Sequence, residues 1–326
     1  MKIDNIKILN FRSIKNTSFE CSNFNIFVGQ NNTGKTNFFE AIQWLFNGTP
    51  KSIDIEDLKY KSESSNTIEV EITFSNALQG AESMRNEANK TKIKNLLGTS
   101  DKVTIKRSSL EPKKRIVLIG DEIKDPGTGF DKALNDFLPK FEYISTRHYF
   151  EDVAKFSNKT PVGIMLSTVL EAILESNEKY IEFKQKFKSL FEDDDSEIKI
   201  KFDALGESVR LYLEKQFSDC ESVKFEVTPP SFEDLLKKFE TVVNDGVETY
   251  AHEKGDGMQR ALMLAIIQAY ADFRKNREDI GKSFLFFIDV AEIHLHPTAQ
   301  RKLKTVLLEL CQNQDQVFLN THSHFY

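Results

Sequence analysis

The chain is poor in cysteine, in long apolar runs and in excess basic charge. Its three cysteines, Cys21, Cys220 and Cys311, lie far apart and lack the spacing of metal ligands. This spacing indicates reduced structural thiols and supports neither a disulfide framework nor a zinc site. Since no apolar stretch is long enough to cross a bilayer and the first residues lack the apolar centre of a signal peptide, we expect a cytoplasmic protein without a membrane partner.

Net charge limits the class of binding partner. The formal charge of −6 at pH 7 argues against a surface coated with basic side chains, although a local groove could still bind a phosphate backbone. With 326 residues, of which 40% are hydrophobic and 29% charged, the chain can form one large or two modest globular domains. DNA is therefore neither indicated nor excluded as a partner.

The segment from Gly29 to Thr36 reads Gly-Gln-Asn-Asn-Thr-Gly-Lys-Thr, which is the pattern of a phosphate-binding loop. A strand pattern precedes it and a helical pattern follows it, a context that disfavours an ordinary glycine turn. Gly29 and Gly34 would let backbone N–H groups surround a phosphate at the positive end of the helix dipole. Lys35 would reach the β- and γ-phosphates of ATP, and Thr36 would bind Mg²⁺. The other residues expected to contact the nucleotide are Asn31, Asn32, Thr33 and Asn37.

A second part of the same site is expected far along the chain. Residues 283–289 are almost continuously apolar and end in Asp289, the natural partner of Thr36 on Mg²⁺. A further strand at 316–320 leads to His322. The sequence predicts that the strand before the phosphate loop and the strand ending at Asp289 are neighbours in one sheet, and that everything between them is an insertion.

The intervening chain alternates apolar and polar residues in three segments, which predicts an antiparallel sheet beside the site. These segments are 67–74, 102–107 and 115–119. The last two would pair through a turn at 111–114. Helical spacing marks three other segments, 82–97, 163–191 and 232–243. The acidic run 192–195, placed between a helix and a strand pattern, is typical of a solvated loop.

These patterns predict an α/β protein in four parts. The parts are an N-terminal piece of the nucleotide-binding head at 1–60, an antiparallel piece at 61–150, a helical insertion at 151–245 and a C-terminal piece of the head at 246–326.

Residues 255–260, Gly-Asp-Gly-Met-Gln-Arg, open a helical stretch, which alone is typical of a turn and a helix cap. The order of the motifs along the chain is more specific than this segment alone. It runs from the phosphate loop through a long insertion, this glycine-rich segment, the acidic strand and Leu-His-Pro to a strand ending in Thr-His-Ser. This order resembles the split ATPase heads of the ABC type. The sequence resembles the overcoming-lysogenization-defect (OLD) family of anti-phage ATPases, with RecF and structural-maintenance-of-chromosomes (SMC) heads as more distant relatives. The residues that carry the resemblance are 10–14, 29–36, Arg147, 255–260, 292–297 and 321–323.

The resemblance implies two P-loop heads, each with an inserted antiparallel sheet and a helical insertion, that sandwich two ATP molecules. Lys35, Thr36 and Asp289 would act in cis, and the segment 151–245 would be a dimerisation arm. The signature residues Gly255, Gly257 and Gln259 would contact the γ-phosphate of the ATP held by the second chain.

The roles of several residues can be interpreted in two ways. His322 resembles the histidine that senses the γ-phosphate, or else it makes a structural hydrogen bond at a strand end. Arg12 either lies near the phosphates or is a surface arginine. His294 and His296 fit a loop that contacts the dimer partner better than they fit a metal site.

One position departs from the family pattern. Relatives carry a second acid directly after the acidic strand, where it positions the attacking water, but here Val290 follows Asp289 and cannot accept a proton. Glu292 lies three positions beyond Asp289 and would need a rearranged loop to act on the same water. We therefore expect tight ATP binding with slow hydrolysis, so that nucleotide occupancy acts as a dimer switch.

OLD nucleases continue past the Thr-His-Ser segment into a TOPRIM domain with metal-binding carboxylates, whereas this sequence stops at Tyr326. The run 193–195 has the letters Asp-x-Asp but neither the strand nor the upstream glutamate. We expect this chain not to cut DNA, and the effector to reside in a longer natural protein or in a partner subunit.

Three functions are compatible with these observations. The first is an ATP-binding regulatory head for anti-phage defence that acts as a homodimer, or a larger homo-oligomer, with a nuclease or another effector. The second is a DNA-repair clamp that grips duplex DNA when ATP is bound, and the third is an ATP-dependent scaffold. Six basic residues could line a DNA groove or form the solvated face of a hairpin: Lys102, Lys106, Arg107, Lys113, Lys114 and Arg115.

Overall fold

The computed structural model describes residues 1–62, 65–84, 86–124, 130–144, 163, 165, 169–170, 173–174, 177–217, 219–228, 240–275, 282–289, 297–312 and 315–322. The chain divides into two compact units. The first, called the head here, comprises Met1–Glu151 and His252–Tyr326, and the second, called the insertion unit, comprises Asp152–Ala251. No helix within the described ranges combines the length and the apolar character needed to cross a bilayer.

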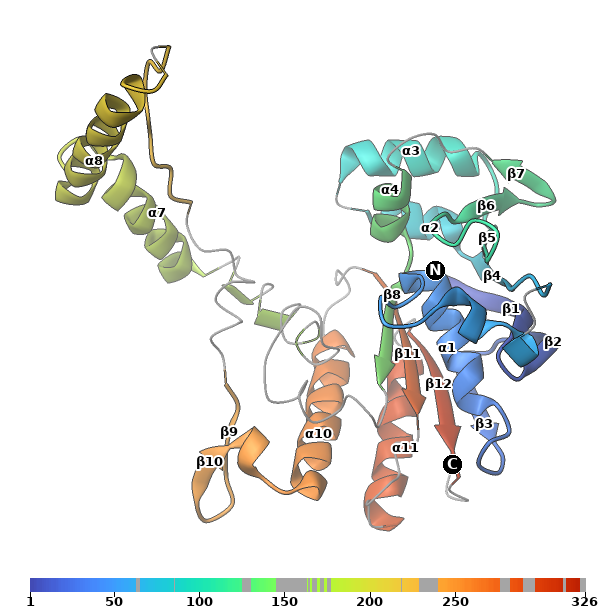
Figure 1. Ribbon diagram of the computed structural model, residues 1–326. Helices are drawn as coiled ribbons and strands as arrows, with labels where there is room; N and C mark the ends of the chain where they lie inside the picture. Colours follow the sequence, from blue (N-terminus) through green and yellow to red (C-terminus); the bar gives the residue numbers. More distant parts are fainter. Residues whose placement is uncertain are drawn as a thin grey trace. The chain divides into compact units, whose positions relative to one another are not determined.

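A parallel sheet forms one layer of the head (Figure 1). Its strand order among the described residues is β3 (Phe24–Val28), β12 (Gln316–Thr321), β11 (Phe284–Asp289) and β8 (Lys140–Ile144). Every residue of β11 and β12 is buried. Such strands are covered on both faces, which explains their almost continuous apolar sequence.

The strand order corrects two predictions from the sequence. The strand before the phosphate loop and the strand ending at Asp289 are not neighbours, because β12 pairs with both and lies between them. The chain between them is not wholly an insertion either, since β8 pairs with β11 in the same sheet. Thr36, in the first turn of the helix that follows β3, can still reach Asp289 across the intervening strand, because neighbouring strands lie only about 4.8 Å apart.

A second, antiparallel sheet has the order β2-β1-β4-β5-β6-β7 within the described chain. Its strands are β1 (Lys2–Phe11), β2 (Ile14–Glu20), β4 (Glu69–Ser75), β5 (Val103–Ser108), β6 (Ile116–Ile119) and β7 (Glu122–Lys124). The predicted hairpin is confirmed, because β5 and β6 pair with Ile105 opposite Val117. On β4 the alternation of Val70, Ile72 and Phe74, all buried, directs one face into the core.

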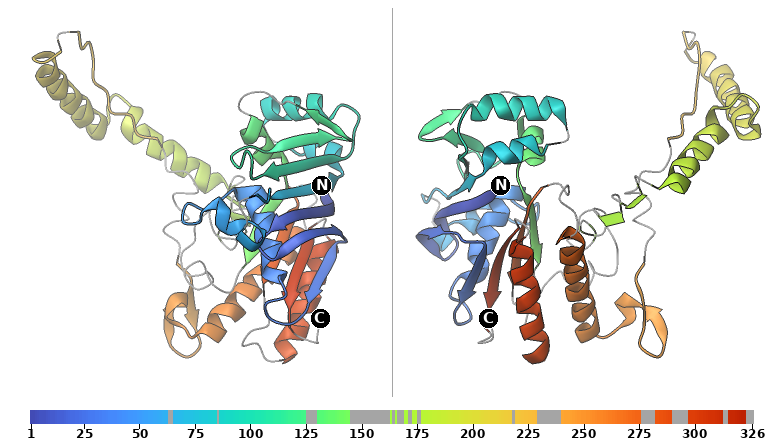
Figure 2. Two further views of the ribbon diagram at one scale, coloured as in Figure 1. Left: turned by 45° about the vertical axis from the view of Figure 1, so that its right-hand side comes forward. Right: turned by 180° about the vertical axis from the view of Figure 1, so that it is seen from behind.

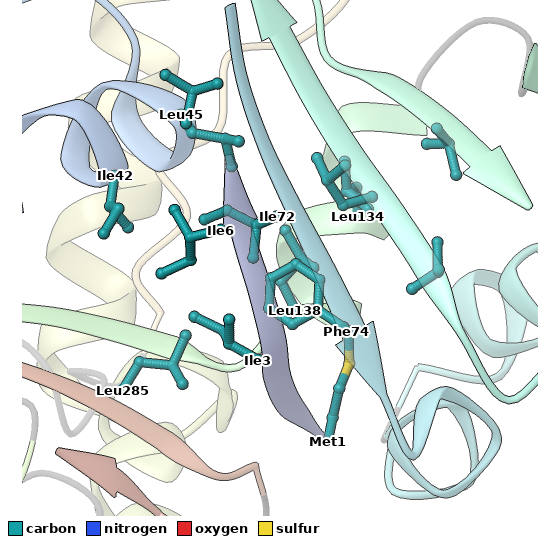
Figure 3. Close-up of a cluster of buried hydrophobic side chains, with 14 of the residues drawn as sticks. Met1, Ile3, Ile6, Ile42, Leu45, Ile72, Phe74, Leu134, Leu138 and Leu285 are labelled. Atoms are coloured by element: carbon teal, nitrogen blue, oxygen red, sulfur yellow. The ribbon is translucent and has the colours of Figure 1, made fainter. Parts of the chain in front are cut away.

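Helix α1 (Lys35–Asn47) lies between the two sheets. Phe39 meets Phe287 of β11 edge-on at 5.1 Å between ring centroids, and Phe46 stacks on Phe141 of β8 at 4.8 Å. Figure 3 shows Ile42 and Leu45 of α1 in the same cluster as β1 and β4 side chains. Six residues of α1 are buried, so both sheets fix the helix whose first turn follows the phosphate loop.

The remaining helices of the head cover its two sheets. Figures 1 and 2 show α10 (Asp256–Lys275) and α11 (Pro297–Gln312) side by side along the parallel sheet, where Tyr270 of α10 contacts Phe284 of β11. The other helical segments of the head are α2 (Ala77–Glu82), α3 (Glu87–Leu97), α4 (Phe130–Phe137), η1 (Ile55–Leu58), η2 (Tyr60–Ser62) and η3 (Ala251–Glu253), the last of which begins one residue before the head's second segment.

The insertion unit contains a pair of helices, α7 (Glu178–Glu192) and α8 (Glu197–Glu214), and a small hairpin of β9 (Val242–Asn244) and β10 (Glu248–Tyr250). Two predictions are corrected here. The acidic run is followed by a helix, not a strand, because the local alternation of Glu-Ile-Lys-Ile-Lys continues into apolar residues at helical spacing. The helix predicted at 232–243 extends too far, since β9 begins at Val242. Residues 232–239 of that prediction lie outside the described residues.

Candidate nucleotide-binding site

The phosphate loop joins β3 to α1 and depends on its glycines. Gly34 has a φ of +94°, in the left-handed region that favours glycine, and a Cβ there would lie 2.8 Å from Ser13 Oγ. At Gly29 a Cβ would meet Thr33 Oγ1 at 3.1 Å. The side chains of Asn31, Asn32 and Thr33 are exposed. The two glycines therefore let the backbone of the loop lie close to Ser13 and Thr33, while the tip of the loop is exposed.

Lys35 bends back over this loop. Its Nζ donates hydrogen bonds to the carbonyl oxygens of Gly29 and Gln30, both at 2.8 Å. Thr33 Oγ1 donates to the same Gln30 carbonyl at 2.9 Å. The ammonium group thus lies among the loop's backbone atoms, at the start of a helix whose dipole favours an anion.

Thr36 and Asp289, which are 253 residues apart in the sequence, meet in this structure. Thr36 Oγ1 donates to Asp289 Oδ2 at 3.0 Å. Asp289 is 7% exposed, and two further described side chains contact its carboxylate: Asn320 Nδ2 donates to Oδ1 at 2.5 Å and Tyr143 OH donates to Oδ2 at 3.4 Å.

Sequence reasoning missed Tyr143 and Asn320. For Asn320 a signal existed, because a polar residue ends an otherwise apolar strand next to the Thr-His-Ser segment. Its contact depends on the strand pairing, in which Asn320 lies directly beside Asp289. Tyr143 gave no signal, because nothing in the sequence marked β8 as a member of the parallel sheet.

The turn between β1 and β2 packs against the phosphate loop and α1. Asn37 Nδ2 donates to Ser13 Oγ at 2.7 Å, and an Arg12 Nη1 atom lies 2.5 Å from a carboxylate oxygen of Glu40. Arg12 also donates its backbone N–H to the Leu58 carbonyl at 2.7 Å. The Arg12 side chain is therefore held on α1 one turn beyond Thr36.

The glycine-rich signature forms the turn into α10. Gly255 is exposed, and a Cβ built there has no atom within 4 Å among those described. Gly257 lies in the first turn of the helix. Gln259 is 5% exposed, and its Nε2 donates to the carbonyls of His252 at 3.3 Å and Lys254 at 2.6 Å. In this chain the Gln259 amide therefore holds its own turn.

The remaining predicted site residues are placed differently. His322 is exposed directly after β12, whose Thr321 pairs with Val28 at the start of the phosphate loop. Glu292 and Val290 lie outside the described residues. So do three further residues named from the sequence: Arg147, His294 and His296.

The donor set fits magnesium. Mg²⁺ prefers oxygen ligands and is commonly bound by one or two protein oxygens together with substrate phosphates and water. A threonine hydroxyl beside an aspartate carboxylate, next to a phosphate loop, provides such a pair. Within the described part of the chain no three His, Cys, Asp or Glu residues are grouped to hold a metal by themselves.

The predicted basic surface is largely engaged in contacts within the protein. Lys102 pairs with Asp4 at 2.9 Å, and Arg115 pairs with Asp131 at 2.8 Å. Lys106 pairs with two glutamates of β4, Lys114 with Glu111, and Arg107 is buried. These contacts favour a structural role for the basic residues of the hairpin over a DNA groove.

Comparisons with known proteins point to a family of ATPase domains. The AAA ATPase domain family matches residues 1–124 and 76–326. Old nuclease of Escherichia phage P2 is 29% identical over 348 residues, covering 99% of this chain and 56% of that protein. Endonuclease GajA of Bacillus cereus (strain VD045) is 27% identical over 340 residues, with the same 99% and 56% coverage. The chain thus spans about half the length of these two relatives.

A solved Smc head, bound to the C-winged helix domain of ScpA, shares the fold with a TM-score of 0.56 at 14% identity, over 99% of this chain and 90% of that one. The predicted fold class, an ABC-type head with an inserted antiparallel sheet, is therefore confirmed, as is the resemblance to the OLD family. Since the family match extends over the whole sequence, this chain belongs to the AAA ATPase domain family.

Proposed function

We propose that this chain is the ATP-binding head of an OLD-like anti-phage system, which dimerises around ATP and thereby regulates a nuclease or another effector. The observation that carries the proposal is the hydrogen bond between Thr36 and Asp289, which unites the phosphate loop with a buried acid 253 residues away. The relatives named nucleases supply the effector class, and the fold supplies the geometry of a head.

The phosphate loop and the residues that contact it have distinct tasks in this proposal. Thr36 and Asp289 hold Mg²⁺ through oxygen atoms, and Lys35 leaves the loop carbonyls to bind the β- and γ-phosphates. Bound magnesium supplies positive charge that offsets the phosphate charge. The backbone N–H groups from Gly29 to Lys35 surround the phosphates, and Ser13 keeps the turn of β1 and β2 against the loop.

Hydrolysis is proposed to be slow. Val290 follows Asp289 in the sequence and has no atom that can accept a proton from water. Nucleotide occupancy, rather than rapid turnover, would then decide whether two heads are joined. A steady-state rate above about 1 s⁻¹, which is ordinary for an enzyme, would contradict this part of the proposal.

The second half of the site is proposed to come from another copy of the chain. Gly255 is exposed at the turn before α10, with Gly257 and Gln259 directly after it. The segment 151–245 is proposed as the dimerisation arm, because the described helix α7 has no buried residue and exposes Phe183 and Leu190. Such apolar surface is typical of a site that a partner covers.

Solution mass tests the dimer. Light scattering with ATP and Mg²⁺ should show a doubling of mass relative to the protein without nucleotide. Lys35→Ala should abolish both the doubling and the heat of ATP binding in calorimetry. Lys113→Ala, at an exposed lysine in the turn between β5 and β6, is the matched control and should behave like the unmodified protein. An unchanged response in Lys35→Ala would refute the proposal.

A second candidate is a DNA clamp, favoured by the likeness to an Smc head. A clamp would bind duplex DNA only with ATP, and its affinity would fall steeply as salt rises, because phosphate contacts release counterions. The regulatory head predicts DNA affinity that does not respond to ATP. Titration of labelled duplex DNA at two salt concentrations, with and without ATP, separates the two functions.

A further inference from the structure

Asp289 is held by its neighbours in an asymmetric way. Its Oδ1 accepts a hydrogen bond from Asn320 at 2.5 Å, whereas its Oδ2 accepts from Thr36 at 3.0 Å and from Tyr143 at 3.4 Å. One oxygen is therefore committed to a single short contact within the sheet. The other oxygen faces the first turn of α1 and shares its contacts.

The sheet explains this arrangement. β12 and β8 flank β11 on opposite sides, and the pairing sets Asn320 beside Asp289 while Tyr143 lies beside Phe287. Side chains two residues apart on a strand share a face, so Asp289 and Phe287 point to the same side. Phe39 of α1 contacts both Phe287 and Tyr143, which identifies this side as the one that α1 covers.

Asn320 is a polar residue whose burial destabilises the fold, and its only described side-chain contact is with Asp289. It is 1% exposed, and its Oδ1 has no hydrogen-bond partner among the described atoms. Leaving a buried polar atom without a hydrogen bond destabilises a fold, whereas an apolar residue of similar size would avoid that cost. The side chain makes one described contact, to Asp289, so its role is to be sought there.

We propose that Asn320 and Tyr143 are positioning residues that set the Asp289 carboxylate for magnesium. Asn320 holds Oδ1, so that Oδ2 is the oxygen presented beside Thr36. Tyr143 supports Oδ2 through a longer contact that gives way more easily. Magnesium demands near-ideal geometry, and partners that orient a ligating carboxylate commonly change metal affinity by about 10–100-fold. This inference rests on the proposed magnesium site.

The test compares nucleotide binding with and without the metal. Binding of a fluorescent ATP analogue is measured first in EDTA and then at rising Mg²⁺, in the unmodified protein and in Asn320→Leu. The variant should need at least about tenfold more Mg²⁺ for the half-maximal increase in affinity. Its affinity in EDTA should stay within about twofold, because the loop and Lys35 are untouched. Tyr143→Phe should shift the Mg²⁺ midpoint in the same direction by a smaller factor.

Asn25→Leu is the matched control. Asn25 is also a buried asparagine of the parallel sheet, but its amide donates to the carbonyls of Ser22 at 2.8 Å and Val317 at 3.3 Å, away from Asp289. This control should lower the melting temperature and leave the Mg²⁺ midpoint unchanged. If Asn320→Leu does not fold by circular dichroism, Asn320→Ala carries the same prediction, since it removes the donor without adding volume.

The outcomes separate the two proposals. An unchanged Mg²⁺ midpoint in the Asn320 variant overturns the positioning role. So does an equal loss of affinity in EDTA and in Mg²⁺, because that would be a general structural defect. Absence of any Mg²⁺ effect in the unmodified protein would instead overturn the magnesium site on which the inference depends.

Discussion

Helices α1 and α7 are similar in length and in aromatic content, yet they are used in opposite ways. α1 buries six of its 13 residues between two sheets. α7 buries none of its 15 residues, and its aromatic side chains contact one another along the helix, as in the pair Phe187 and Phe191 at 5.3 Å. Aromatic residues at helical spacing therefore do not by themselves indicate a core; the elements packed against them decide.

The largest expected effect tests this comparison with two phenylalanines. Phe39→Ala on α1 should cost about 3–5 kcal/mol, because the side chain is fully buried against β11. Phe183→Ala on α7 should cost less than about 1 kcal/mol, since Phe183 is 43% exposed. Because Phe39 lies in the head and Phe183 in the insertion unit, urea unfolding followed by far-UV circular dichroism, which reports the helices of both units, gives the two stability losses.

The same pair also tests the proposed arm. Phe183→Ala should weaken ATP-dependent self-association although the head remains stable, whereas a conservative Phe39→Leu should leave self-association intact. Equal stability losses in Phe39→Ala and Phe183→Ala would break the comparison between the helices.

A loss of stability of intermediate size is expected when Arg107, which contacts the end of α1, is replaced. Buried Arg107 donates Nε to the Leu45 carbonyl at 3.0 Å and Nη1 to the Pro112 carbonyl, and its guanidinium lies over the Trp44 ring. Burial, followed by the nearby Arg115 charge, lowers the pKa of Arg107 to about 10. Arg107→Ala should cost about 2 kcal/mol, because it leaves two carbonyls unpaired.

Arg107→Lys sharpens that measurement. Lysine keeps a positive charge near the negative end of the α1 dipole but cannot donate in two directions from a planar group. It should recover less than half of the stability lost in Arg107→Ala. Full recovery by lysine would show that charge alone accounts for the contribution of Arg107.

The smallest effect depends on pH. Glu142 of β8 is buried, and burial raises the pKa of its carboxyl from 4.5 to about 8, although the nearby Lys140 charge opposes the rise. The folded protein therefore binds this proton more tightly than the unfolded chain. The stability of the fold should fall as pH rises from about 4.5 to about 8, and stay low above that range.

Glu142→Gln removes this dependence. Its stabilising effect, about 1–2 kcal/mol after the cost of burying an amide, should be complete above pH 8 and vanish below pH 4.5. Melting temperatures at pH 5 and pH 8.5 provide the measurement. A variant whose advantage does not change between these values would show that Glu142 does not titrate in the folded protein as described.

Local chemistry made part of the site predictable. The spacing of the glycines and Lys35 predicts the phosphate loop, because few other conformations need that spacing. Asp289 can be identified from the sequence because it ends an apolar strand. Strand order could not be predicted in the same way. Neither the position of β12 between β3 and β11 nor the entry of β8 into the sheet leaves a local signal, and the contacts of Asn320 and Tyr143 depend on both.

The Lys35 side chain, which donates to two carbonyls of its own loop, has a consequence for ligand selectivity. A small anion such as sulfate must compete with bonds the ammonium already makes, and it recovers little in exchange. A polyphosphate chain offers the same ammonium several charged oxygens at once while it also occupies the backbone donors. The loop should therefore discriminate by phosphate count, with ATP and ADP favoured over AMP and inorganic anions.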